Sequence, residues 1–156
     1  MSSQPIEEKL SKRKAASVLQ LLFKTARLGN DLALERVNFQ KKDTPPLRPS
    51  HTSLFPHIDF LGTRITDIAS RLGISKQAVS QLVDDLEQRG TLERTPDPLD
   101  GRAKLVTYSK RGRLEILEGL TLLNQIEKEL EQALGRRKMH VFRKTLSEIL
   151  AHFESS

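Results

Sequence analysis

Apolar residues recur every three or four positions near the middle of the chain, in two short runs separated by a glycine. The first run contains Ile68, Ala69 and Leu72. The spacing predicts two short helices joined by a tight turn at Gly73, which is the pattern of a helix-turn-helix. The apolar face of the second helix is marked by Val79, Leu82, Val83 and Leu86.

The residues at the ends of these runs support the same boundaries. Thr66 is expected to cap the first helix and Ser75 the second, because a hydroxyl at this position accepts a backbone N–H of the first turn. Gly73 supplies the permissive backbone of the turn. Gly90 is expected to end the second helix.

A hairpin is predicted directly after this pair of helices. Residues 92–95 and 104–108 are strand-like, and the segment between them is rich in turn residues, including Pro96, Pro98 and Asp100-Gly101. Residues 62–64 can add a short strand to the same sheet. The whole unit therefore predicts a winged helix-turn-helix.

The amino-terminal half of the second helix is polar and contains no acid on its outward side. Glutamine can pair with adenine, lysine can reach guanine, and serine can contact a base edge or a phosphate. The acids of this helix, Asp84, Asp85 and Glu87, lie farther along, where a recognition helix leaves the groove. The alternative is a solvated helix face in a winged domain that binds protein. The residues expected to face DNA from this helix are Ser75, Lys76, Gln77, Ser80 and Gln81.

The segment from Ile65 to Gly112 resembles the motif of the MarR family of bacterial transcriptional regulators. That motif couples the two helices to a wing containing Arg, Asp-Pro and Asp with Arg, followed by a strand, a Thr or Ser and a final Gly. The chain has Gly101 where many members carry a second Arg, so the resemblance does not extend to that phosphate contact. The matching residues are Arg94, Asp97-Pro98, Asp100-Gly101-Arg102, the strand at 104–107, Ser109 and Gly112.

Long amphipathic helices are predicted on both sides of the winged unit. The first carries an apolar stripe from Leu10 to Leu34, and further helices are expected after Ser109 and after Gly135. A winged unit cannot cover so much apolar surface, so the terminal helices are expected to form a dimer interface; the alternative is a monomer that folds them back on itself. The resemblance implies that these helices interlock across a two-fold axis, as they do in MarR-like proteins.

The segment between the first helix and the winged unit is expected to border a ligand pocket. Residues 40–49 form a linker, and Pro49 can start a short helix that Pro56 limits. His51 is interpreted as partly exposed or facing a ligand, and His57 as a hydrogen-bonded packing residue. The resemblance implies small aromatic or anionic effectors, for which the expected pocket residues are His51, Phe55, His57, Phe60 and Arg64.

Composition and charge further limit the functions that the protein can have. The 156 residues have a net charge of +6, which favours an anionic partner, and no cysteine, which excludes disulfides and cysteine zinc sites. Aromatic residues are few, so the core is expected to be mainly Leu, Ile, Val and Ala. No leader or membrane-spanning run is evident, so a cytoplasmic location is expected. An enzyme is not expected, because there is no glycine-rich phosphate loop, and no acid or thiol lies at metal or triad spacing from the four histidines.

The sequence therefore predicts an α+β protein, mainly α with a small β wing. The expected regions are 1–48 and 113–156 for dimerisation and 49–112 for DNA binding. The predicted function is a homodimeric, sequence-specific transcriptional regulator, a repressor released by a small molecule, that binds a pseudo-palindromic operator in double-stranded DNA without cofactor or metal. The alternative is a winged module for protein assembly. Beyond the recognition helix, the predicted DNA-binding residues are Arg94, Arg102, Lys104, Lys110 and Arg111.

Overall fold

The computed structural model describes residues 5–155, which are mainly helical with one small antiparallel sheet. This confirms the predicted α+β class. The elements, in chain order, are α1 (Ile6–Ala16), α2 (Val18–Gln40), α3 (Pro49–Thr52), the 3-10 helix η1 (Phe55–His57), β1 (Thr63–Arg64), α4 (Ile65–Leu72), α5 (Lys76–Gln88), β2 (Leu92–Asp97), β3 (Asp100–Tyr108), α6 (Lys110–Leu134) and α7 (Arg136–Glu154).

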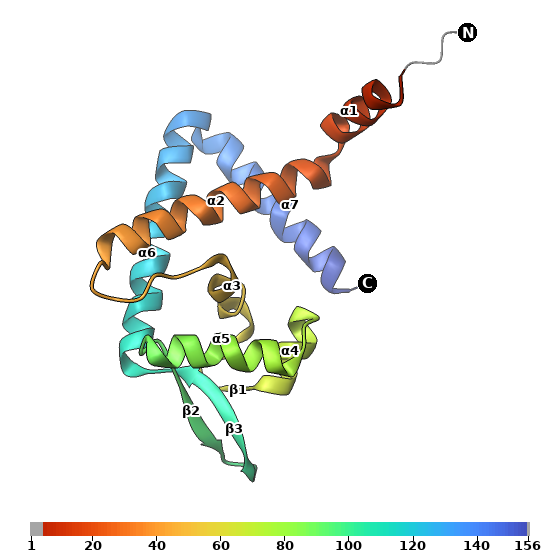
Figure 1. Cartoon of the computed structure of the whole chain (residues 1–156). Helices are drawn as coiled ribbons and strands as arrows, with labels where there is room; N and C mark the ends of the chain where they lie inside the picture. Colours follow the sequence, from red (N-terminus) through yellow and green to blue (C-terminus); the bar gives the residue numbers. More distant parts are fainter. Residues whose placement is uncertain (1–4, 156) are drawn as a thin grey trace.

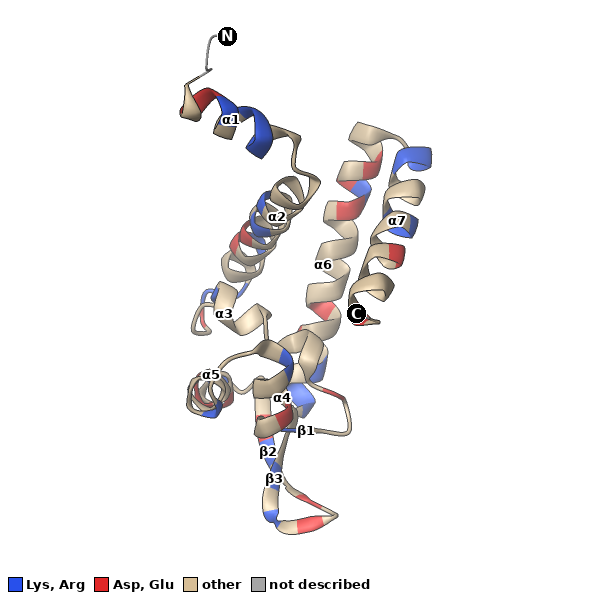
Figure 2. Ribbon diagram, turned by 90° about the vertical axis from the view of Figure 1, so that its right-hand side faces the viewer, with Lys and Arg blue, Asp and Glu red and all other residues tan. Residues whose placement is uncertain are grey.

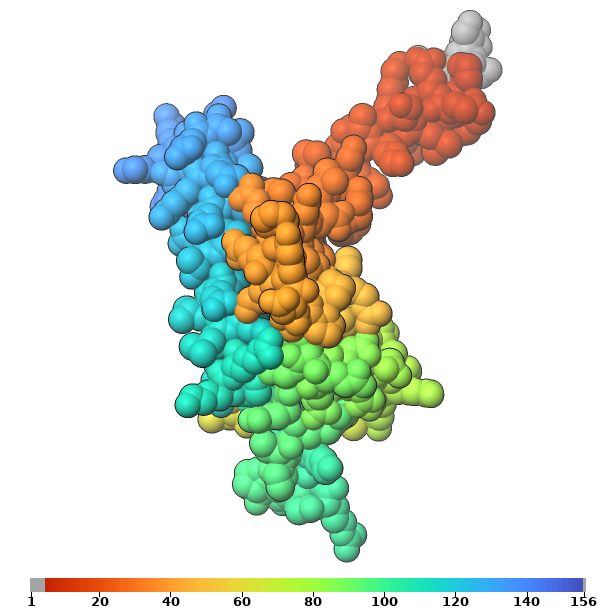
Figure 3. Space-filling model, turned by 60° about the vertical axis from the view of Figure 1, so that its left-hand side comes forward, coloured from red at the N-terminus to blue at the C-terminus, as the bar shows by residue number. Residues whose placement is uncertain are grey.

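The elements gather at two ends of an elongated molecule. Helices α3 to α5 and the sheet form one end, while α2, α7 and the distal part of α6 form the other (Figure 1). Helix α6 starts beside the sheet and runs into the second group. The β2–β3 hairpin projects from the first end, and α1 extends away from the second as an arm (Figure 3).

Helices α4 and α5 form the predicted helix-turn-helix. Gly73 ends α4 in the left-handed conformation, with φ 66°, and Ser75 caps α5 by accepting the Ala78 N–H at 3.1 Å. The predicted cap at Thr66 is wrong. Arg64 is the N-cap of α4, and the Thr66 hydroxyl donates to Asp67 instead, because β1 continues into α4 without an intervening residue.

The sheet has the strand order β1-β3-β2, with both pairs antiparallel. The predicted short strand at 62–64 is present as β1, where Thr63 pairs with Val106. Both hairpin strands run closer to the tip than predicted. Strand β2 passes through Pro96, which an edge strand tolerates because the missing N–H faces away from its partner.

The core lies between the helix-turn-helix and the sheet and is mostly aliphatic, as predicted. Tyr108 is its aromatic member, and its hydroxyl donates to the Phe55 carbonyl at 2.9 Å. The fully buried aliphatic side chains are Leu54, Ile68, Val79, Val83, Leu86 and Val106.

The flanking helices differ from prediction on the amino-terminal side. The expected single helix is two, because Ser17 adopts an extended conformation and caps α2 by accepting the Gln20 N–H at 3.3 Å. The carboxy-terminal prediction is confirmed: Ser109 caps α6 by accepting the Gly112 N–H at 2.9 Å, and Gly135, with φ 89°, separates α6 from α7. None of the described helices is long and apolar enough to cross a membrane.

The segment between α2 and β1 contains less helix than predicted. Pro49 starts α3 as expected, but α3 ends at Thr52. A separate 3-10 turn, η1, then contains Pro56.

Candidate nucleic-acid interface

The amino-terminal half of α5 presents the polar face that the sequence predicts. Lys76, Gln77 and Gln81 are exposed, and the first turn contains no acid. Ser75 is also exposed, although its hydroxyl already caps the helix. Ser80 is half-buried and lies 3.3 Å from an Arg94 nitrogen that donates to its hydroxyl. Hydrogen-bonding groups for base edges are therefore free mainly at Lys76 and Gln77, since the side-chain N–H of the exposed Gln81 donates to Asp85 at 3.3 Å.

The acids in the second half of α5 are all paired with cations. Arg94 of β2 contacts Glu87 and lies 2.8 Å from Asp84, and Arg48 contacts Asp85. These pairs offset the negative charge that α5 would otherwise bring towards a polyanion.

Arg94 therefore has a different environment from the one predicted. Its side chain is 19% exposed and joins α5 to β2, so it positions the recognition helix rather than extending to solvent. Farther along the wing, the Asp100 carboxylate accepts the Arg102 backbone N–H at 3.1 Å.

His51 lies behind α5 and contacts it. Its side chain is buried, its Nδ1 accepts the Arg48 N–H at 3.2 Å, and its Nε2 is 3.4 Å from Asp85. Burial lowers the pKa of His51, and this outweighs the hydrogen bond to Asp85. The pKa of Asp85 is lowered as well, first by a hydrogen bond from Gln81. The interpretation of His51 as partly exposed or facing a ligand is wrong.

The wing carries exposed cations above an ion pair at its base. Arg102 and Lys104 are exposed on β3. At the base, Asp97 is buried, accepts the Leu99 N–H at 2.8 Å and binds Arg64 Nε at 2.7 Å, and both contacts lower its pKa. Figure 2 shows the hairpin projecting beyond α5, with basic residues along it.

The start of α6 adds two further exposed cations, Lys110 and Arg111. Arg111 is engaged within the protein, since its Nε donates to Glu115 at 3.2 Å. The helix begins in close contact with Thr91, the residue before β2: a Cβ at Gly112 would overlap the Thr91 carbonyl oxygen.

A cavity of about 540 Å³ separates the winged unit from the long helices, with α2 and α6 on one side and η1 and the sheet on the other. Phe55 and Phe60 line it, as predicted. His51, His57 and Arg64 are outside its lining: His51 binds Asp85, Arg64 binds Asp97, and His57 is half-buried elsewhere.

The cavity instead takes its polar groups from residues that the sequence analysis missed. Arg89 and Glu115 are the main ones, with Lys41 beside them. Arg89 has an ordinary helix-end position in the sequence, and only the fold shows that its side chain points inward. Within residues 5–155, no three His, Asp or Glu side chains gather as metal ligands would.

Helices α4 and α5, with the three-stranded sheet and its projecting hairpin, define a winged helix-turn-helix protein. Residues 55–103 match the model of the MarR family. This match lies within the winged helix-turn-helix and covers less than half of the chain, so the chain resembles the MarR family over that part. No curated protein sequence matches the chain.

Solved structures share the fold over nearly the whole chain. A protein named RV1404 from Mycobacterium tuberculosis has a TM-score of 0.70 at 15% identity, over 98% of this chain and 97% of that one. The transcriptional regulator Tm0710 from Thermotoga maritima has a TM-score of 0.56 at 23% identity, over 87% and 96%. The transcriptional repressor CouR, bound to a 23-mer DNA duplex, has a TM-score of 0.60 at 25% identity, over 96% and 99%.

Proposed function

We propose that the protein is a homodimeric transcriptional regulator of the cytoplasm that binds a pseudo-palindromic DNA site and is a repressor released by a small molecule. The observation that carries the proposal is the exposed polar face of α5 at Lys76, Gln77 and Gln81, beside acids that are already neutralised. A helix of this kind can enter a major groove and offer paired donors and acceptors to base edges. The neighbour described as a repressor bound to DNA supports the same role.

The wing completes the proposed contact. With α5 in a major groove, the exposed Arg102 near the tip of the hairpin is suited to the adjacent minor groove, where a narrow A·T-rich segment attracts arginine. Lys104 and Lys110 are suited to phosphates. The Asp97–Arg64 pair holds the hairpin in the required direction.

Dimerisation through residues 1–48 and 113–156 would explain the apolar surface of the long helices. One protomer exposes large side chains along α1, α2, α6 and α7, far more than a monomer ordinarily leaves in water. A two-fold axis through these helices would place two α5 helices on one face of DNA. The exposed side chains include Val18, Leu21, Phe23 and Phe39 on α2, Leu117 and Leu120 on α6, and Phe142 and Phe153 on α7.

Release by a small molecule is supported by the cavity between the winged unit and the long helices. A volume of about 540 Å³ with a mainly apolar lining suits a small organic ligand. Because the cavity lies between the two parts whose relative position sets the spacing of the α5 helices, a ligand there can favour a dimer that no longer fits DNA.

The test is direct binding of labelled duplexes, measured by fluorescence anisotropy against random competitor over a range of salt concentrations. If several cations per protomer meet phosphates, log affinity falls with log salt at a slope of about 0.9 per contact. A slope near zero, or equal affinity for a selected and a random duplex, would favour a winged module that serves protein assembly.

A further inference from the structure

The first nine residues of α7 carry five cations and no acid, and all five side chains are exposed. Elsewhere the two signs of charge are mixed, since the whole chain has 26 basic and 20 acidic residues. These nine positions therefore form a patch of one sign, which we call the basic surface of α7. Its cations are Arg136, Arg137, Lys138, Arg143 and Lys144.

Neighbouring acids do not neutralise this surface. Arg136 binds Glu131 at 3.0 Å, and Lys144 lies 3.9 Å from Glu148. Both pairs are exposed, and exposed ion pairs are weak and screened by salt. The other three cations make no ion pair with any acid in residues 5–155. The surface therefore keeps most of its positive charge.

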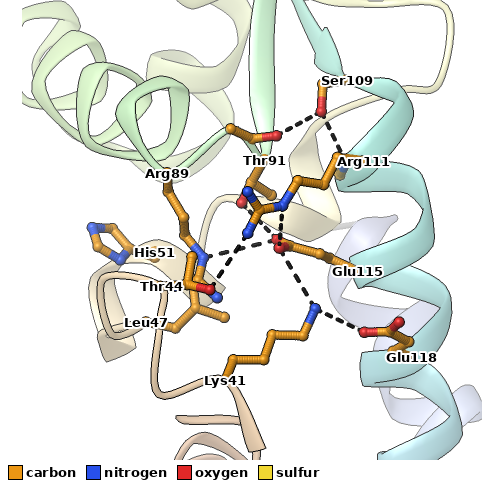
Figure 4. Close-up of polar contacts among 12 residues, drawn as sticks. Lys41, Thr44, Leu47, His51, Arg89, Thr91, Ser109, Arg111, Glu115 and Glu118 are labelled. Atoms are coloured by element: carbon orange, nitrogen blue, oxygen red, sulfur yellow. Dashed lines mark hydrogen bonds and ion pairs between the residues drawn. The ribbon is translucent and has the colours of Figure 1, made fainter.

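The cations around Glu115 show the opposite arrangement. Lys41, Arg89 and Arg111 lie 3.5, 3.8 and 3.2 Å from its carboxylate (Figure 4). Those charges serve the fold, because they join the ends of α2 and α5 to α6. The unpaired cations of α7 make no such connection, and cations in the first turn of a helix oppose its dipole. The basic surface of α7 is therefore not explained by the stability of the fold.

The basic surface is also remote from the DNA-binding face proposed above. Helix α6 separates the two: it begins at Lys110, beside the sheet, and its 25 residues extend for about 37 Å before α7 starts. Figure 2 shows the start of α7 at the end of the molecule opposite the hairpin. Because the Debye length at physiological salt is about 8 Å, cations at this distance add little to the binding of a duplex held by α5 and the wing.

A linear polyanion fits the basic surface. Arg136 and Arg143 are seven residues apart, as are Arg137 and Lys144, so each pair lies two turns apart on one side of α7. The cations therefore extend over about 10 Å of helix. Duplex DNA carries one charge for about every 1.7 Å of its axis, so a surface of this length can meet several phosphates at once.

A segment of DNA is a better match than a membrane. A helix that binds a membrane surface inserts its apolar side into the lipid, but the apolar side of α7, with Leu146 and Ile149, is half-buried where α7 packs against α6. DNA is also close by under the proposed function. A dimer that holds one segment through α5 has neighbouring segments of the same DNA at high local concentration.

We propose that the basic surface of α7 binds the phosphates of a second DNA duplex, so that one dimer bridges two segments of DNA. The first segment is the one held by α5 under the proposed function, on which this inference rests. Contact with phosphates alone makes the second binding independent of sequence and steeply dependent on salt.

A bridging assay with the full chain tests this inference. A biotinylated random-sequence duplex is fixed to streptavidin beads, and the retention of a fluorescent duplex without biotin is measured with and without protein. Fluorescence anisotropy measures the binding of a single duplex in parallel. The native chain should retain the second duplex, and retention should fall as the salt concentration rises. Binding of a single duplex without retention of a second would overturn the inference and leave the proposed function intact, whereas failure to bind any duplex would reject both.

A triple variant, Arg137→Gln with Lys138→Gln and Arg143→Gln, removes the three unpaired charges of the basic surface. Retention of the second duplex should fall roughly tenfold or more, and its salt slope should decrease by about 0.9 for each cation that met a phosphate. The affinity for a single duplex should be unchanged. Thermal melting and sedimentation should show the same fold and assembly as in the native chain.

The matched control removes the same charge from α1, through Lys9→Gln, Arg13→Gln and Lys14→Gln, all at exposed positions. This control should bridge as the native chain does. Equal retention by the native chain and the α7 variant, or an equal loss in both variants, would overturn the inference.

Two other results would assign the basic surface of α7 to a different partner and overturn the inference. A change of oligomeric state in the α7 variant would assign these cations to contacts between copies of the chain. Binding of the native chain to vesicles of phosphatidylserine and phosphatidylcholine in equal parts, without bridging of duplexes, would assign them to a membrane.

Discussion

Gly112 lies where α6 begins against Thr91, the residue before β2, and its role is steric. A Cβ there would overlap the Thr91 carbonyl oxygen, which belongs to the backbone and cannot move aside cheaply. Gly112→Ala should therefore lower the free energy of unfolding by about 1 to 3 kcal/mol, as overpacking does. Urea unfolding at one protomer concentration measures the effect.

Gly119 is the matched control for this substitution. It lies in the same helix with open space around its Cα, so alanine should leave stability unchanged or raise it by up to about 1 kcal/mol. If both variants behave alike, the close approach of α6 to Thr91 is not a constraint on the fold.

His51 makes stability depend on pH in the mildly acidic range. Because its pKa is lowered in the folded protein, the unfolded chain binds a proton more readily, and the histidine's contribution is lost as the pH falls below about 6.5. The contribution changes by at most about 1.4 kcal/mol per pH unit for one proton. Urea unfolding between pH 7.5 and 5.5 should show a steeper loss for the native chain than for His51→Gln. Equal pH slopes would contradict the burial of a neutral His51 against Asp85.

At the scale of elements, α5 and the hairpin have different tasks in the proposed complex. Gln77→Ala should cost about 1 to 3 kcal/mol on a selected site and little on random DNA, because Gln77 is exposed and suited to a base edge. Arg102→Ala should mainly reduce the preference for A·T-rich flanks. Competition binding with site variants measures both effects.

Lys110→Ala provides the contrast for these two variants, since a lysine that touches phosphate alone should weaken every duplex to the same degree. A uniform loss for all three variants would contradict the division of tasks between helix and wing.

Local rules were sufficient for many boundaries of the elements. Ser75 and Ser109 cap α5 and α6, because serine is favoured at the N-cap of a helix. Gly73 and Gly135 end α4 and α6, because glycine is favoured just after the last helical turn. The break at Ser17 was missed, since an unbroken apolar stripe outweighed a single hydroxyl.

The partners of charged residues could not be predicted in the same way. Arg94 binds two acids of α5, Arg64 binds Asp97, and Arg89 is turned into the cavity, whereas a sequence-based argument treats each arginine as free to reach a ligand. These choices depend on which segments the fold brings within a few ångströms, and residues that pair over more than thirty positions, such as Arg48 and Asp85, carry no local signal.

At the scale of the whole molecule, a second copy of the chain should cover the exposed face of the long helices. Phe142 is 47% exposed in one protomer, so Phe142→Asp should spare the protomer fold and split the dimer, because an unpaired carboxylate would be buried in the interface. Sedimentation equilibrium measures the change. Leu99→Asp, at the exposed tip of the hairpin, is the control and should stay dimeric. An intact dimer of the Phe142 variant would place the interface elsewhere.

Selection of bound DNA from a random pool tests the central claim most directly. A homodimer with one exposed α5 per protomer should enrich a two-fold symmetric sequence whose half-sites are centred about one helical turn, roughly 10 base pairs, apart. Sequencing the bound pool gives both the sequence and the spacing. Recovery of such a motif is the predicted result, and a bound pool with no enriched sequence would contradict the assignment of this protein as a sequence-specific regulator.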